Sequence, residues 1–193
     1  VLLHASVHWL AWRQTGATDL HFFAALSLVG LGMALLTLLA ASAGRMQALG
    51  VVVFPLAALL LLSYALYGHS TLPEPLDWRL LLHAWLALLA NATLALSAVL
   101  AVFLWLQERA LRRRTFHLWL RALPPLTELE ALLFRSIAVG FALLTATLLT
   151  GVLFVDDLFA QHLVHKTVLS VLSWLVFGGL LLGRHLRGWR GTK

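Results

Sequence analysis

Long runs of apolar residues restrict the possible folds of this chain more than any other feature. Hydrophobic residues make up 61% of the 193 residues and charged residues only 11%, whereas an ordinary soluble domain has ~25% charged residues. Runs of ~20 apolar residues match the thickness of a bilayer core, where only helices and closed barrels satisfy every backbone hydrogen bond. Strict alternation of apolar and polar residues is absent, so the sequence predicts transmembrane helices rather than a barrel or a soluble domain.

The apolar runs predict an all-α, polytopic transmembrane helical bundle with five full spans plus one truncated span. The full spans cover approximately residues 20–42, 48–67, 80–106, 131–155 and 163–186, and the truncated span covers residues 1–12. We expect a single transmembrane domain over residues 1–193, and a piece of a longer protein, since the first residue is Val rather than Met. Thr127 and Glu130 have the spacing of a capping box at the start of the fifth predicted helix, if the truncated span is counted as the first. Gly179 and Gly183 have a spacing that lets another helix approach closely.

The basic residues predict how the chain is oriented. If the spans alternate across the bilayer, one side holds 11 of the 14 Lys and Arg residues, and the other side keeps Arg13, Arg79 and Lys166. Cytoplasmic loops of membrane proteins are enriched in Lys and Arg. We therefore predict a multi-pass membrane protein whose loop 107–130 and C-terminus are cytoplasmic. The same sorting accounts for the net charge of +6, so we expect a lipid bilayer and no nucleic acid as its partner.

Most of the nine histidines fall on the predicted outer side. His83 lies about one turn inside the span 80–106, and it shares a helical stripe with Asn91. An ionisable residue inside a span usually faces the protein interior or a water-filled cavity. Two interpretations of His83 stay open: a histidine hydrogen-bonded to a neighbouring helix, or a ligand of a metal or of haem iron.

Two further histidine pairs have helical spacing. His4 and His8 are separated by four residues, and His162 and His165 by three, so each pair can point at one site. Two helices that each donate a histidine are a common way to build a haem or metal site in a bundle. Most of the eight tryptophans lie near span ends, as interfacial anchors do, while Trp85 and Trp174 are the best placed to line a flat aromatic ligand.

The residues exclude several classes of enzyme. The chain has no Cys, so it has no disulfide, thiolate metal site or thiol nucleophile. It also lacks a phosphate-binding loop, an HExxH motif and a Ser-His-Asp arrangement. We predict no catalytic residues and expect a protein that acts by binding.

Several stretches together resemble the cytochrome c assembly protein family, and most closely the YpjD/HemX-like branch of the CcsA/CcmC superfamily. The resemblance is strongest from about residue 80 onward, and it rests on the order and spacing of His83–Ala90, Leu123–Glu130, Arg135, Gly140–Phe141, Leu144–Thr145, Gly151, His165–Trp174 and Arg187–Gly191. Full-length relatives have a further helix at each end, which implies that this chain lacks both.

The resemblance implies a helical inner-membrane protein. The better-known members bind haem and present it on the outer face for attachment to apocytochrome c, with a tryptophan-rich loop flanked by histidine ligands. His83 matches the first of those histidines, whereas the matching loop Phe154–Lys166 has no tryptophan. A further histidine of some members corresponds here to Leu182.

Two functions follow. The first is an integral membrane protein of cytochrome c assembly and haem handling, which binds or presents haem b at the outer face, with other assembly or membrane proteins as expected partners. His83 would be one ligand of the haem iron, and His4, His8, His162 and His165 compete for the second. The alternative is a non-haem scaffold subunit that assembles with a partner protein, as the missing tryptophan loop suggests. A transporter is disfavoured, because the spans contain almost no acidic residues.

Overall fold

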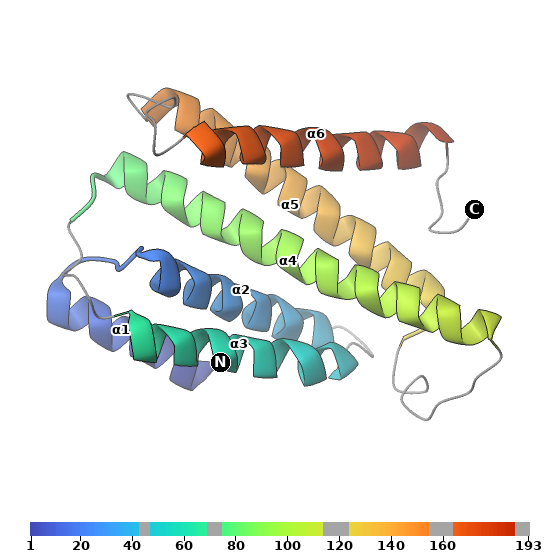
Figure 1. The fold of residues 1–193 in the computed structure, drawn as a ribbon, viewed down its shortest axis with the longest axis horizontal. Helices are drawn as coiled ribbons and strands as arrows, with labels where there is room; N and C mark the ends of the chain where they lie inside the picture. The colour runs from blue at the N-terminus through green and yellow to red at the C-terminus, as the bar shows by residue number, and fades with distance from the viewer. Residues whose placement is uncertain (43–46, 69–74, 114–123, 155–163, 188–193) are drawn as a thin grey trace.

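The protein folds as a bundle of helices (Figure 1). The structure is a computed structural model that describes residues 1–42, 47–68, 75–113, 124–154 and 164–187. In that part of the chain the helices are α1 (Leu2–Thr15), α2 (Phe22–Ser42), α3 (Gln47–Tyr67), α4 (Trp78–Arg112), α5 (Leu126–Phe154) and α6 (Val164–Arg187). Five of them, α2 to α6, are long and apolar enough to cross a membrane. The predicted all-α transmembrane bundle is therefore confirmed.

The helix α4 is longer than the predicted span 80–106. It begins after Asp77, whose side chain accepts a hydrogen bond from the backbone N–H of Arg79 at 3.4 Å, and it runs for 35 residues. At ~1.5 Å per residue such a helix is ~52 Å long, whereas the apolar core of a bilayer is ~30 Å thick. Its last turns, which carry Arg109 and Arg112, therefore extend past the apolar core.

The predicted capping box at the start of α5 is wrong. The carbonyl oxygen of Pro125 accepts hydrogen bonds from the backbone N–H groups of Glu128 at 2.9 Å and Leu129 at 3.1 Å. Pro125 is therefore the residue that caps the helix, and Thr127 already lies inside the first turn. The proline pair lies directly before the helix, where the missing backbone N–H of proline costs no helical hydrogen bond.

The long helix α4 lies at the centre of the bundle. It packs most extensively against α5 on one side and against α2 on the other, while α3 packs on α2 and α6 packs on α5 (Figure 1). A core of buried apolar residues fills the contacts of α4 with its neighbours, and its members are Met33, Leu49, Val53, Ala92, Leu96, Leu100, Leu104, Leu129, Leu133 and Ile137.

Glycines let α4 approach its two main neighbours closely. A Cβ atom on Gly32 of α2 would lie 2.8 Å from the Cβ of Ala92, and one on Gly140 of α5 would lie 2.6 Å from a methyl carbon of Leu94. Small residues at such contacts are typical of membrane helices, where van der Waals packing drives association. By contrast, a Cβ on Gly179 of α6 would meet nothing within 4 Å.

The two ends of the bundle differ in the helix ends and residues that they contain. The pocket end is where α1 and α3 finish and α2 and α4 begin. The basic end is where α4 and α6 finish and α5 begins, and it carries Arg109, Arg112 and Arg184.

Candidate functional site

Two histidines join α1 to the rest of the bundle. His4 and His8 lie on one face of α1, and both place Nε2 within hydrogen-bond distance of the Ser27 hydroxyl on α2, at 2.9 Å and 3.0 Å. His4 is only 5% exposed, and Ser27 is fully buried. In the structure His4 and His8 thus share Ser27 as a hydrogen-bonding partner.

The shared serine restricts the protons of the two imidazole rings. A hydroxyl has one proton to donate and two lone pairs. Ser27 can therefore donate to one Nε2 atom at most, and the other Nε2 must carry a proton and donate to the Ser27 oxygen. At least one of the two histidines consequently presents Nε2–H to the serine.

A column of stacked rings continues from this pair to α3. The rings of His4 and His8 have centroids 5.7 Å apart at an interplanar angle of 21°. His8 also stacks on Tyr64, with centroids 4.9 Å apart at an interplanar angle of 15°. Tyr64 is 2% exposed. The His8 ring is therefore held by a stack in addition to its hydrogen bond, which gives it a defined orientation.

The sequence ends α1 just beyond these histidines. Gly16 adopts a left-handed backbone conformation with φ 72°, and its N–H donates to the carbonyl oxygen of Trp12 at 2.8 Å. Glycine is the residue that adopts this conformation without a steric cost. The chain then reverses through Asp19, whose carboxylate lies 2.9 Å from Nδ1 of His21 and also accepts a hydrogen bond from its backbone N–H at 3.0 Å. This turn brings α2 back alongside α1.

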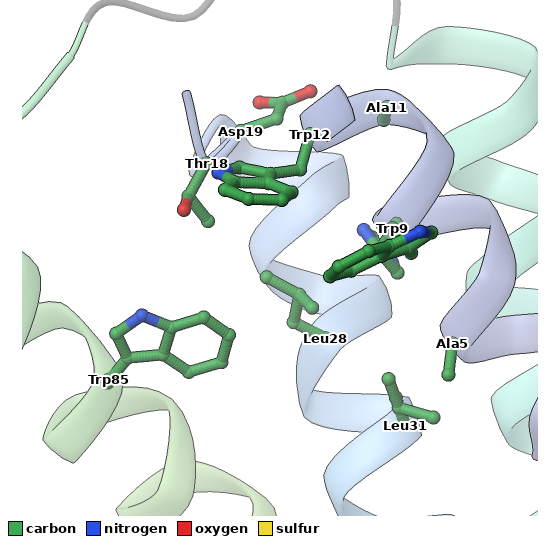
Figure 2. A pocket seen from close by; sticks show the side chains of 10 residues that line it. Ala5, Trp9, Ala11, Trp12, Thr18, Asp19, Leu28, Leu31 and Trp85 are labelled. Carbon is green, nitrogen blue, oxygen red and sulfur yellow. The ribbon is translucent and has the colours of Figure 1, made fainter. Parts of the chain in front are cut away.

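A pocket of about 320 Å³ opens beside His8, between α1, α2 and α4. Figure 2 shows the indole of Trp85, on α4, on the opposite side of the opening from Trp9 and Trp12 of α1, with Leu28 of α2 between them. The rings of Trp9 and Trp12 are themselves 5.1 Å apart. The full lining is Ala5, His8, Trp9, Ala11, Trp12, Thr18, Asp19, Leu28, Leu31 and Trp85. Flat aromatic walls with one imidazole and one carboxylate thus form the site.

His83 lies near the same end of the bundle but does not line this pocket. Its Nδ1 lies 3.1 Å from the Thr150 hydroxyl on α5. That hydroxyl also lies 2.9 Å from the carbonyl oxygen of Ala146, to which it donates its proton. With the threonine proton so used, Nδ1 of His83 is the donor in the contact with Thr150. His83 and Trp85 therefore use different faces of α4, one toward α5 and the other toward the pocket.

The other predicted site residues lie apart from the pocket. Trp174 of α6 donates from Nε1 to the Thr145 hydroxyl of α5 at 2.9 Å and stacks on Phe141 at 5.6 Å, so it joins α6 to α5. Asn91 is exposed on α4, and His165 is exposed at the start of α6. His162 lies outside the described residues.

Sequence reasoning passed over three polar residues of this site: Ser27, Tyr64 and Asp19. Ser27 and Tyr64 are polar residues within predicted spans, and polar side chains there often face the bundle interior. Both could have been selected on that ground, although not as partners of His4 and His8.

The fold and the site define a multi-pass membrane protein with an aromatic pocket at one end of a helical bundle. The sequence model of a family described as cytochrome c assembly protein matches residues 1–193. The chain belongs to this family, as the resemblance predicted.

Relatives support the YpjD-like branch. The chain is 34% identical over 116 residues to the inner membrane protein YpjD of Escherichia coli strain K12, across 59% of this chain and 43% of YpjD. It is 38% identical over 112 residues to an uncharacterized 28.8 kDa protein of Azospirillum brasilense, across 57% of this chain and 41% of that protein. It is 37% identical over 68 residues to the cytochrome c biogenesis protein CcsA of Prochlorococcus marinus strain MIT 9515, across 34% of this chain and 22% of CcsA.

These matches cover less than half of the length of each relative. No solved structure matches the chain.

Proposed function

We propose that this protein handles haem during cytochrome c assembly, binding or presenting it at the outer face of the inner membrane. The observation that carries the proposal is the pocket in which Trp9, Trp12 and Trp85 surround an opening beside the oriented ring of His8. In this proposal the protein acts by holding a ligand and makes or breaks no bond itself. Membership of the cytochrome c assembly family supports this choice of ligand.

The residues of the pocket fit a flat, largely apolar group with one metal ligand. Ligand pockets range over ~300–1,000 Å³ and combine apolar walls with a few oriented polar groups, and this pocket has about 320 Å³. Haem b, when bound, would supply an iron that binds imidazole nitrogens. The tryptophans would flank the ring, and His8 would meet the iron.

Two histidines are the proposed iron ligands, on different grounds, and of the two only His8 lines the pocket, while His83 faces α5. His8 is proposed because it lines the pocket, and His83 because it matches a flanking histidine of haem-binding relatives. His4 would act as a positioning residue, since it shares Ser27 with His8 and stacks on its ring. His162, His165, Asn91 and Trp174 stay candidates from the sequence, and those of them that the structure describes lie away from the pocket wall.

An absorbance spectrum tests the proposal. The full-length protein, expressed with ample haem supply and purified in detergent, is expected to show a Soret band. His8→Ala and His83→Ala should each reduce or shift that band, whereas His185→Ala, an exposed histidine at the basic end, should leave it unchanged. Absence of the band in the unmodified protein would contradict haem binding. Equal spectra for all three variants would contradict the assignment of His8 and His83 as iron ligands.

We also propose how the protein lies in the membrane. The basic end would face the cytoplasm, together with loop 107–130 and the C-terminus, and the pocket end would face outward. This orientation is supported by the placement of 11 of the 14 basic residues on one side of the predicted spans, and by the inner-membrane description of YpjD.

A scaffold subunit is the second candidate function, and α6 is the observation that favours it. None of the described residues of α6 is buried, and the helix packs mainly against α5. A partner protein would cover the outward face, which includes Val168, Leu172 and Leu175. Replacing Leu172 with Trp should then change the mass of the complex purified from its native membrane, with no change in the haem spectrum. An unchanged mass would argue against the scaffold.

A further inference from the structure

A groove lies at the basic end of the bundle, away from the pocket beside His8. The helices α5 and α6 diverge toward the end where α5 begins and α6 finishes (Figure 1). Between them is a groove of about 560 Å³, lined by Arg135 and Phe134 of α5 and by Arg184 and His185 of α6, among others. Small side chains on α5, at Ala131 and Ala138, keep this space open.

The groove holds more positive charge than its own residues neutralise. The guanidinium of Arg184 lies 3.6 Å from the ring centroid of Phe134, and its Nη1 lies 3.6 Å from a carboxylate oxygen of Glu130. A charge-assisted hydrogen bond is ~2.7–2.9 Å long, so this ion pair is loose. Within the described residues, Nη1 of Arg184 is buried and has no hydrogen-bond partner.

The second arginine adds a charge that has no partner among the described residues. Arg135 is exposed, and it makes no hydrogen bond or ion pair within the described parts of the chain. The groove thus combines two guanidinium groups with one carboxylate. Two guanidinium groups aimed into one groove suit the oxygens of a phosphate, because their planar forks donate two hydrogen bonds to such groups.

The groove also changes from charged to apolar along the length of α5 and α6. From Arg135, α5 runs one turn deeper into the bundle to Ala138, and on α6 the residue one turn deeper than Arg184 is Leu181. Charged groups therefore lie toward the end of the bundle and apolar groups toward its middle. A phospholipid has the same polarity, with its phosphate at the membrane surface and its acyl chains in the core.

We propose that this groove binds an anionic phospholipid, with Arg135 and Arg184 on its phosphodiester and an acyl chain along Ala138 and Leu181. Basic pockets between transmembrane helices are suited to the headgroups of anionic lipids. The choice of a lipid over a free phosphate rests on the apolar half of the groove, which a phosphate ion would leave empty. This site is separate from the haem pocket, so the two proposals succeed or fail independently.

Native mass spectrometry of the full-length protein in detergent tests the proposal, with phosphatidylglycerol and phosphatidylcholine added separately. We expect the protein to retain phosphatidylglycerol in preference to phosphatidylcholine. Each of the variants Arg135→Gln and Arg184→Gln should weaken that retention by roughly fivefold, since a basic residue near a membrane surface contributes ~1 kcal/mol to anionic lipid binding. The control Arg109→Gln, an arginine of α4 that lies over Trp105 outside the groove, should change little.

A second variant keeps the test informative if an arginine variant fails to fold. Glu130→Gln removes the carboxylate that competes for Arg184, so it should strengthen phosphatidylglycerol retention. Equal retention of the two lipids, or unchanged retention in Arg135→Gln and in Glu130→Gln, would overturn the proposal. Displacement of the lipid by millimolar inorganic phosphate would show an anion site that does not select a lipid, and it would overturn the acyl-chain part of the proposal.

Discussion

The Ser27 hydroxyl links α1 to α2. It bridges His4 and His8, at 2.9 Å and 3.0 Å. We predict that Ser27→Ala loosens α1 from the bundle and leaves the contacts of α4 with α5 intact. The serine lies on α2 and takes no part in the core between α4 and α5, so the effect should be confined to α1.

The size of the effect follows from the two contacts. An interhelical hydrogen bond in a membrane protein contributes ~0.6 kcal/mol on average, so the two together contribute about 1 kcal/mol. His4 is 5% exposed, and a buried polar group that loses its partner costs ~1–3 kcal/mol. We therefore expect α1 to be destabilised by about 2 kcal/mol, which raises the population of detached α1 about 30-fold.

Hydrogen–deuterium exchange in nanodiscs measures this population. Amides of α1 should exchange faster in Ser27→Ala, because a helix of only 14 residues is marginally stable without tertiary contacts. The matched control is Ser63→Ala, since the Ser63 hydroxyl donates to the carbonyl oxygen of Leu60 in its own helix at 2.7 Å. The reasoning is refuted if both variants behave alike, or if α4 and α5 lose protection as much as α1.

Three further predictions concern packing, polar contacts and orientation. Gly140→Ala should lower the melting temperature, because the added Cβ would lie 2.6 Å from a carbon of Leu94 and overpacking costs ~1–3 kcal/mol. Gly179→Ala should leave the melting temperature unchanged, because the space around Gly179 is open. Equal melting temperatures of the two variants would contradict the packing argument. Thr150→Val removes the hydrogen bond with His83 and should cost ~0.6 kcal/mol in thermal unfolding, so a loss above about 2 kcal/mol would show a larger role for this contact. Because the chain has no Cys, a single introduced cysteine reports on which side of the membrane it lies. Asp77→Cys should react with a membrane-impermeant thiol reagent added to intact spheroplasts, and Glu108→Cys should not. The reverse pattern would refute the proposed orientation.

Much of the fold could be predicted from the sequence. The expected spans agree with α2, α3 and α6 to within about two residues at each end, because apolar length is what a span requires. The predicted ends of α4 and α5 agree less well with the structure. Both helices continue into polar sequence beyond the apolar run, where hydropathy carries no information and capping decides the boundary, as Pro125 does for α5.

The candidate site was predictable only within single helices. The four-residue spacing of His4 and His8 was enough to place both on one face, as observed. The different faces of His83 and Trp85 also follow from their spacing, since two residues turn a helix by ~200°. The partners of His4, His8 and His83 could not be predicted from these spacings, because Ser27, Tyr64 and Thr150 are far from the histidines in the chain.

The sequence by itself determined that this protein is a helical membrane bundle, where its helices run and which of its ends is basic. The physical reason is that a bilayer forces each apolar segment to satisfy its own backbone, so length and composition decide the element. Only the tertiary structure decided which faces meet: His8 with Tyr64, Trp85 with the pocket, and Gly140 rather than Gly179 at a close contact. Lipid is as apolar as leucine, so hydrophobicity does not mark the inward face of a membrane helix, and packing and polar partners select it instead.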